Sequence, residues 1–303
     1  MKIRYMIAAV VVGLVLLSAG SVFCEDTVSM SEWTQLVEKI GTNGSVNWSA
    51  GYIEAVGIGA PPDRYIGKPQ ARPTALRAAE VVAKRNLLEI TKGVRIDSST
   101  TVKDYAVESD VINSQVEGFV KGAQVVKQEY MSDGTVEVTV RMPLFGNFSQ
   151  VIMPKIMEKK LSIPPPVVTP PPPEPVVAAP VVPPPAAPAP VVYTGLVVDA
   201  RGMQARPAMS PKIVDESGQE VYGTIIVDRE FAVQQGVSGY ARDLTSAQGN
   251  ARVTNNPLTV KGVKVQGAGR SDIIISNADA AALQAAADNM AFMKKCRVMI
   301  VLD

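Results

Sequence analysis

The residues of this chain that could carry chemistry are acids, serines and two cysteines, because the sequence contains no histidine. Histidine is the commonest general base and a common metal ligand, so its absence excludes every Ser-His triad and the usual zinc patterns. A serine–lysine hydrolase would need a Ser-x-x-Lys motif, which the sequence lacks. We therefore predict no enzyme activity, with no catalytic residue, no metal site and no cofactor.

Six aspartates remain as candidates for an acidic or ion-binding site: Asp199, Asp215, Asp228, Asp243, Asp272 and Asp279. The first four are spread along the chain, so only the fold could pair them, and aspartate at such positions is typical of turns and helix caps. The last two flank a predicted strand–helix junction, where ions sometimes bind. No calcium-loop motif accompanies them.

The helix predicted to begin after Ser276 is a candidate anion site. A helix N-terminus presents backbone N–H groups to an anion, here a carboxylate of a peptide or glycan. The candidate residues are Ser276, Asn277 and Asp279. The alternative is a cap that satisfies its own N–H groups.

The first residues predict a signal peptide over 1–24. Lys2 and Arg4 precede an apolar run and then small residues, which is the pattern of a cleaved export signal. An uncleaved anchor and lipidation of Cys24 stay open, although Phe23 departs from the small residue expected before a lipidated cysteine. We expect export to the periplasm or the outer membrane, with membrane association only if Cys24 is lipidated or the signal is uncleaved.

A proline-rich segment, residues 161–192, divides the rest of the chain into two modules. Residues 164–190 contain 14 prolines. Proline lacks a backbone N–H and favours polyproline II, so such a segment spans on the order of 80 Å as a semi-rigid spacer. We expect an N-terminal domain over 26–160 and a C-terminal domain over 193–303, held apart by this linker.

The N-terminal module is predicted to be α+β. The long helix that Pro73 opens carries alanines on one stripe and ends at Gly93, and small side chains let a helix lie close to a sheet. Strands over 123–130 and 135–142 flank an Asp-Gly pair, a strong hairpin signal. A further amphipathic helix is expected over residues 30–40.

The C-terminal module is predicted to be a separate α/β domain with a mixed sheet. Its elements include a helix over 278–294 and a continuous apolar run over 298–302, which is typical of a strand buried on both faces. Another helix is predicted over 231–244, which Gly236 and Gly239 weaken.

Three runs carry a family resemblance: GYIEAVGIGAPP, then ARPTALRAAEVVAKRNLLEITKGVRI, then GFVKGAQVVKQEYMSDGTVEVTVRMPL. Together, over about residues 46–145, they resemble the bacterial twenty-kilodalton lipoprotein family and are similar to the N-terminal domain of flagellar assembly protein T. The resemblance implies an envelope protein without known enzyme activity and, in the flagellar case, a periplasmic ring role. TGLVVDARG and PKIVDESGQEVYG look like a C-terminal module of such envelope proteins.

The composition also indicates which classes of partner to expect. The formal net charge is +1, and basic residues are scattered without interleaved aromatics, so we expect no nucleic-acid binding. The hypothesis is a structural or assembly scaffold of the cell envelope with protein partners, which the resemblance places among envelope or flagellar proteins. Two alternatives stay open: a periplasmic ligand-binding module for a wall fragment or other anion, and a lipid-anchored surface protein.

Overall fold

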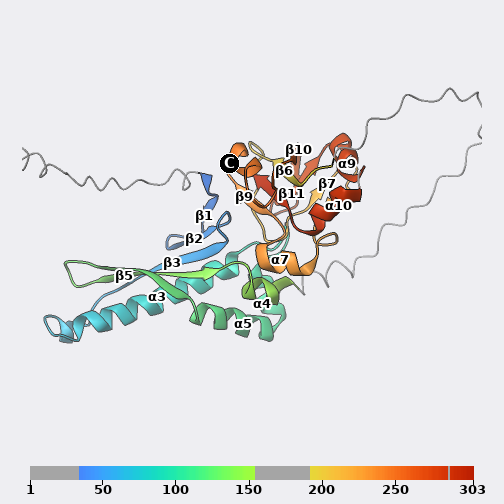
Figure 1. Cartoon of the computed structure of the whole chain (residues 1–303). Helices are drawn as coiled ribbons and strands as arrows, with labels where there is room; N and C mark the ends of the chain where they lie inside the picture. The colour runs from blue at the N-terminus through green and yellow to red at the C-terminus, as the bar shows by residue number, and fades with distance from the viewer. Residues whose placement is uncertain (1–33, 154–191, 286) are drawn as a thin grey trace, which may run out of the picture. The chain divides into compact units, whose positions relative to one another are not determined.

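The computed structural model of this chain describes residues 34–153, 192–285 and 287–303 (Figure 1). The described residues belong to one compact unit. An antiparallel sheet lies in its N-terminal part and a mixed sheet in its C-terminal part, which confirms the predicted fold class. No helix in the described ranges is both long and apolar enough to cross a bilayer.

The first sheet has five antiparallel strands in the order β1-β2-β3-β5-β4. The strands are β1 (Val37–Lys39), β2 (Gly44–Asn47), β3 (Tyr52–Gly59), β4 (Gln124–Tyr130) and β5 (Val136–Pro143). The helical elements of this part are η1 (Asp63–Tyr65), α3 (Ala71–Gly93), α4 (Val102–Glu108), α5 (Asp110–Lys121) and residues 147–153.

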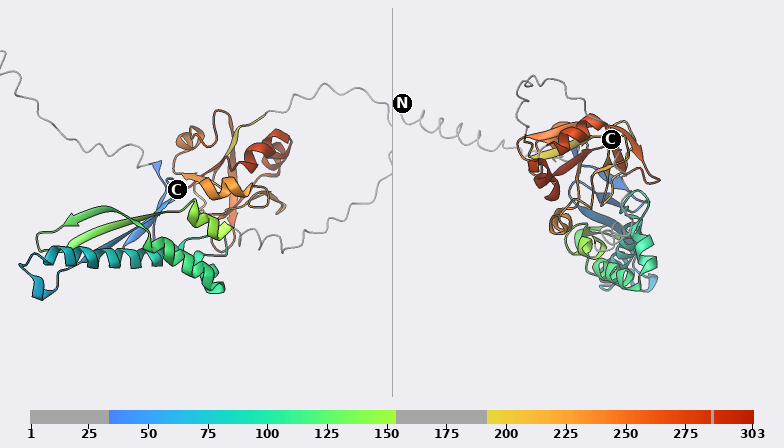
Figure 2. Two further views of the ribbon diagram at one scale, coloured as in Figure 1. Left: turned by 60° about the horizontal axis from the view of Figure 1, so that its bottom comes forward. Right: turned by 90° about the vertical axis from the view of Figure 1, so that its right-hand side faces the viewer.

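The long helix α3 runs along one face of this sheet (Figure 2). Its contact stripe consists of Ala75, Ala79 and Ala83, which are fully buried. Two glycines of β3 meet this stripe: a Cβ on Gly57 would lie 2.2 Å from the Ala83 nitrogen, and one on Gly59 would lie 2.3 Å from the Ala75 oxygen. The prediction of a close helix–sheet approach is confirmed, and it depends on small residues on both elements.

The predicted hairpin is also confirmed. Asp133 Oδ1 accepts a hydrogen bond from the Thr135 nitrogen at 2.9 Å and one from the Thr135 hydroxyl at 2.6 Å. Gly134 has φ +86°, a left-handed conformation that glycine adopts without strain. These bonds lower the pKa of Asp133 and fix the turn between β4 and β5.

The segment near residue 37 differs from prediction. Val37–Lys39 is a strand, with Val37 opposite Asn47 in the register of β2, where the apolar spacing had predicted a helix over residues 30–40. Residues 30–33 lie outside the described ranges. A short apolar pattern is compatible with a helix or with a strand. Here β2 offers an edge with which residues 37–39 pair, so the segment forms a strand.

The second sheet has seven strands in the order β8-β7-β11-β10-β6-β12-β9. Its strands are β6 (Gly195–Asp199), β7 (Ile213–Val214), β8 (Glu220–Tyr222), β9 (Gly239–Ala241), β10 (Pro257–Gln266), β11 (Asp272–Ile275) and β12 (Val298–Val301). The helices are α7 (Arg229–Gln235), α8 (Leu244–Gln248), α9 (Asn277–Gln284) and α10 (Ala287–Lys294).

The sheet is mixed because β6 pairs in parallel with β10 and β12, whereas β11 is antiparallel to β10. All four residues of β12 are buried between β6 and β9, which confirms the prediction of an interior strand. The helix predicted over 231–244 is shorter: α7 ends at Gln235, and Gly236 (φ +81°) turns the chain into β9.

The two modules contact each other through backbone hydrogen bonds. Met209 N donates to Arg95 O at 3.0 Å, and Ser210 N donates to Ile96 O at 2.7 Å. On another part of the interface, Arg242 N donates to Thr34 O at 3.1 Å. These bonds satisfy backbone groups of one module with backbone groups of the other.

Side chains complete this interface. Arg95 donates to Glu38 Oε2 at 2.5 Å and to the Pro207 carbonyl at 2.9 Å, so it bonds to both modules. The Trp48 and Tyr240 rings meet edge to face with centroids 5.8 Å apart. Tyr240 is also held by its hydroxyl, which donates to Ala208 O, and both aromatic rings are buried.

The expectation that a spacer holds the modules about 80 Å apart is therefore wrong for the described residues, which form a continuous hydrophobic core across both modules. The spacer argument used only the local stiffness of a proline-rich segment. Whether two modules dock depends on complementary surfaces, which composition does not show. Residues 161–191 of this segment lie outside the described residues.

Candidate functional site

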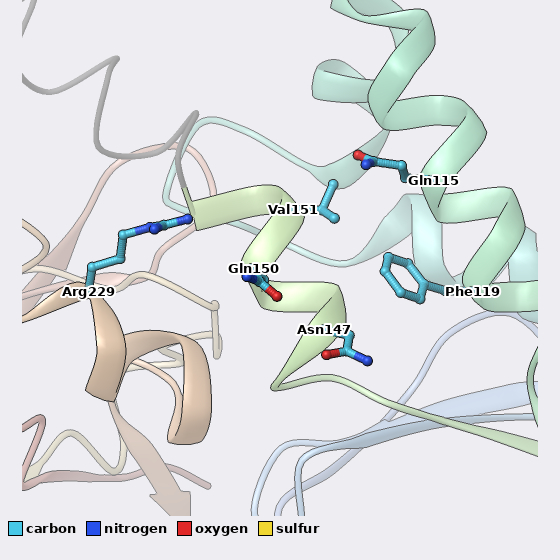
Figure 3. A pocket seen from close by; sticks show the side chains of 6 residues that line it. All are labelled: Gln115, Phe119, Asn147, Gln150, Val151 and Arg229. Carbon is cyan, nitrogen blue, oxygen red and sulfur yellow. The ribbon is translucent and has the colours of Figure 1, made fainter.

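A shallow cleft lies where α5 and helix 147–153 approach α7. It has a volume of about 520 Å³ and is lined by Gln115, Phe119, Asn147, Gln150, Val151 and Arg229 (Figure 3). Gln115 and Phe119 come from α5, and the exposed side chain of Arg229 extends from the first residue of α7 toward helix 147–153. The cleft therefore takes residues from both modules.

Three amides and one guanidinium give this cleft its chemistry. Amides donate and accept hydrogen bonds, and a guanidinium can bind a carboxylate with two parallel bonds. Among the described residues, no acid or thiol lines the cleft. It is suited to binding a peptide or a carboxylate through its polar groups, with Phe119 and Val151 as apolar contacts.

A neighbouring hollow of about 550 Å³ shares Phe119 and Asn147 with the cleft. Its other wall includes Tyr52 and Arg141, at the ends of β3 and β5. Arg141 lies over the Tyr52 ring at 4.0 Å and pairs with Glu54 at 2.6 Å, so its charge is already compensated. This hollow extends the cleft as a mainly apolar groove.

The predicted anion site at the start of α9 is occupied by the protein's own carboxylates. Ser276 Oγ accepts from Asp279 N at 3.1 Å and donates to Asp279 Oδ2 at 2.7 Å. Asn277 N donates to Glu216 Oε2 at 3.3 Å. An external anion would compete with both carboxylates. Anion binding here stays a prediction, and the geometry favours the self-satisfied cap.

Each of the first four candidate aspartates lies in a turn, at a helix cap or in an ion pair with a neighbouring arginine. Asp215 Oδ1 accepts from Gln219 N at 2.8 Å in a turn, and Asp228 is the N-cap position of α7. Asp243 caps α8 by accepting from Ser246 N at 2.7 Å, which lowers the pKa of Asp243. Asp199 pairs with Arg201 at 2.7 Å, and this pairing lowers the pKa of Asp199.

The fold brings two of these acids, Asp199 and Asp243, to one edge of the second sheet together with Asp303. The sequence did not predict this arrangement. Asp199 is the last residue of β6, and Asp243 and Asp303 follow β9 and β12; the carboxyl ends of these three parallel strands meet at one sheet edge. Arg201 lies among them, and its pKa is raised, first by the hydrogen bond to Asp199 and further by Asp243 and Asp303. Arg201 therefore pairs with Asp199 and is further stabilised in its charged form by the other two carboxylates.

Asp272 and Asp279 do not share an ion site. Asp272 begins β11 and lies at the module interface, where its Oδ2 accepts from Ser98 Oγ at 2.7 Å. Asp279 is in the first turn of α9, beyond the other end of that strand. Across residues 34–153, 192–285 and 287–303, no group of three or more Cys, Asp or Glu side chains could hold a metal ion.

The chain has two cysteines, Cys24 and Cys296. Cys24 lies outside the described residues, so its lipidation stays a prediction. Cys296 is fully buried between α10 and β12, as expected of a small hydrophobe, and burial raises the pKa of its thiol to about 11. The guanidinium of Arg252 opposes this effect in part and donates to the Cys296 carbonyl at 3.3 Å.

Comparison with known proteins bears on the C-terminal module. The family described as Treponema pallidum Tp0624, second domain, matches residues 195–303. The C-terminal module is similar to that domain. The match begins at the first residue of β6 and ends at the last residue of the chain, so it covers the whole second sheet. No curated protein matches the chain.

A surface on the N-terminal module remains outside these sites. Four large apolar side chains of β4 and the residue after it are exposed: Val125, Val126, Tyr130 and Met131, at 36%, 42%, 51% and 45%. We call these four residues the hairpin surface. The sequence predicted the hairpin but not this surface, although VEVTVRM alternates between buried and wetter positions and QVVKQEY does not.

Proposed function

We propose that this chain is an exported, non-enzymatic protein of the cell envelope that acts as a structural or assembly scaffold through protein–protein contacts. Export is supported by the basic and apolar residues that begin the sequence. An envelope setting, with a flagellar assembly as one case, is supported by the resemblance of residues 46–145 to envelope proteins.

The observation that carries this proposal is the hairpin surface. Four large apolar side chains are exposed along this strand and its end, and several exposed apolar groups on one element are typical of protein interaction sites. The strand belongs to a sheet edge, and such an edge offers backbone groups as well as side chains to a partner.

The contacts between the modules fix the position of one module relative to the other, which a scaffold requires. Arg95 and Trp48 tie the N-terminal sheet to the C-terminal module, so a partner on the hairpin surface is held at a defined place relative to the second module. Such an arrangement suits an assembly component better than a flexible tether.

A ligand-binding role is the second candidate, and the cleft around Arg229 favours it. A carboxylate of a wall peptide would be compatible with this guanidinium and the amides of Gln115 and Gln150. Saturable binding of wall fragments to the full chain, lost in Arg229→Ala, would support this role. A lipid-anchored surface protein depends on Cys24 and is decided by the mass of the mature N-terminus.

The experiment that tests the scaffold role is photo-crosslinking in the cell. A photoreactive amino acid replaces Val126 on the hairpin surface or, as the matched control, Val81, which is 55% exposed on α3. We expect Val126 to capture envelope proteins that Val81 does not. Equal capture at both positions, or a chain that stays in the cytoplasm, would contradict the proposal.

A further inference from the structure

Strand β4 is an open edge of the first sheet. It pairs with β5 on one side, and no strand among the described residues pairs with its other side. Six of its seven residues are exposed and the seventh is half-buried. An edge of this kind exposes backbone N–H and C=O groups that can pair with another strand, unless charge, proline or a bulge prevents it.

The sequence of β4 is self-complementary when two copies run antiparallel around Gln128. In this register Gln128 lies opposite its own copy, and each residue faces the one equally far on the other side. Lys127 then lies opposite Glu129 of the second copy, and Glu129 opposite the second Lys127. Val126 lies opposite Tyr130.

The charges favour this arrangement. Within one copy Lys127 and Glu129 form an ion pair at 2.9 Å, and their side chains are 60% and 43% exposed. On β5, Glu137 lies directly opposite Glu129, so two like charges are cross-strand neighbours. A second copy would place its Lys127 on the free side of Glu129, which offsets this repulsion and gives a row of alternating charges.

The apolar residues fit the same register. Of the hairpin surface, Val126 is placed against Tyr130 by the pairing around Gln128, whereas Val125 lies beyond the bulge in β4 and Met131 follows the last residue of the strand. An aromatic opposite a β-branched residue is a favourable cross-strand pair. The Lys127–Glu129 and Val126–Tyr130 pairs therefore share one two-fold centre at Gln128.

We propose that β4 pairs with β4 of a second copy of this chain, antiparallel and centred on Gln128, to join the two five-stranded sheets. The inference rests on the proposed function, because it names one partner for the hairpin surface. A bulge between Val125 and Lys127 limits the regular ladder to the central pairs. The contact is therefore small, and the dimer is weak and concentration-dependent.

Sedimentation velocity of the purified full chain over a concentration series tests the pairing. We expect a reversible monomer–dimer equilibrium. Lys127→Glu alone or Glu129→Lys alone places like charges opposite each other at two symmetric positions, and each should raise the dissociation constant about tenfold. The double variant Lys127→Glu/Glu129→Lys restores opposite charges and should restore association.

A disulfide trap tests the centre of the register. In a Cys24→Ser background, Gln128→Cys should form an intermolecular disulfide under mild oxidation, because the two copies of this residue lie opposite each other. Gln124→Cys is the matched control, since it faces Ser132 of the second copy. Circular dichroism confirms that each variant is folded.

Three results would overturn the inference: a chain that stays monomeric at all concentrations, a dimer unaffected by the single charge reversals, or equal trapping at positions 124 and 128. These outcomes are distinct from failure of the proposed function. A monomeric chain whose Val126 still captures envelope proteins retains the scaffold role, whereas a dimer without envelope partners retains only the self-association.

Discussion

At the residue scale, Arg95 has a central place in the contact between the modules. Its guanidinium donates to Glu38 within its own module and to the Pro207 carbonyl of the other, and its side chain is only 13% exposed. Glu38 also accepts from the Trp48 indole at 3.1 Å. Removal of the arginine would leave a largely buried carboxylate and a carbonyl without this donor.

We therefore expect Arg95→Ala to lower the free energy of unfolding by about 2 kcal/mol. The control is Arg85→Ala, because the Arg85–Glu89 pair is exposed and such pairs contribute less than about 1 kcal/mol. Urea denaturation midpoints measure both. Equal effects of the two substitutions would contradict the assigned role of Arg95.

The Cys296 thiol gives a second prediction at this scale. Burial raises its pKa to about 11, so below that pH the folded protein holds it as a thiol, and at pH 8 less than about 1% is thiolate. We expect iodoacetamide to leave Cys296 unmodified in the folded chain and to alkylate it in guanidinium at the same pH. Peptide mass spectrometry locates the label, and rapid alkylation of the folded protein would contradict the burial.

At the scale of elements, the approach of α3 to β3 determines the N-terminal fold. Ala79 and Ala83 on the helix lie against Gly57 on the strand, where an added Cβ would lie 2.2 Å from the Ala83 backbone nitrogen. The helix cannot keep its position if a methyl group is inserted between two backbones, because packed interiors have little free space.

Gly57→Ala should therefore lower the free energy of unfolding by about 3 kcal/mol through overpacking. Gly118→Ala is the matched control: Gly118 lies within α5 with nothing within 4 Å of an added Cβ, and alanine there should stabilise the helix by up to about 1 kcal/mol. Chemical denaturation compares the two. A neutral Gly57→Ala would mean that α3 is not tightly packed on β3.

At the scale of the whole molecule, the contacts between the modules predict that the proline-rich linker is not needed to hold them together. A protease site introduced into residues 164–190 allows the linker to be cut after folding. We expect the two halves to elute together from a sizing column and to unfold in one cooperative transition.

Arg95→Ala provides the control for this experiment, because it weakens the interface without touching the linker. The cut Arg95→Ala protein should separate at lower urea than the cut wild type. Separation of the wild-type halves in native buffer would show that the modules dock only through their covalent connection, and that their contacts alone do not make one compact unit.

The sequence by itself determined the elements with strong local signals. The alanine stripe and Gly93 predicted α3, the Asp-Gly pair predicted the β4–β5 hairpin, and the apolar run near the C-terminus predicted β12. Each signal is local, because propensity, turn chemistry and periodicity act within a few residues. The lack of histidine likewise limits the chemistry, because no fold can supply a side chain that the chain does not contain.

Only the tertiary structure decided how these elements meet. Val82 is an apolar residue of α3, three residues after the buried Ala79, and yet it is 38% exposed, because β3 and β5 cover a narrow face of the helix. The gathering of Asp199, Asp243 and Asp303 around Arg201 depends on the order of parallel strands. The docking of the two modules depends on Arg95 and its partners, which are far apart in sequence and brought together only by long-range packing.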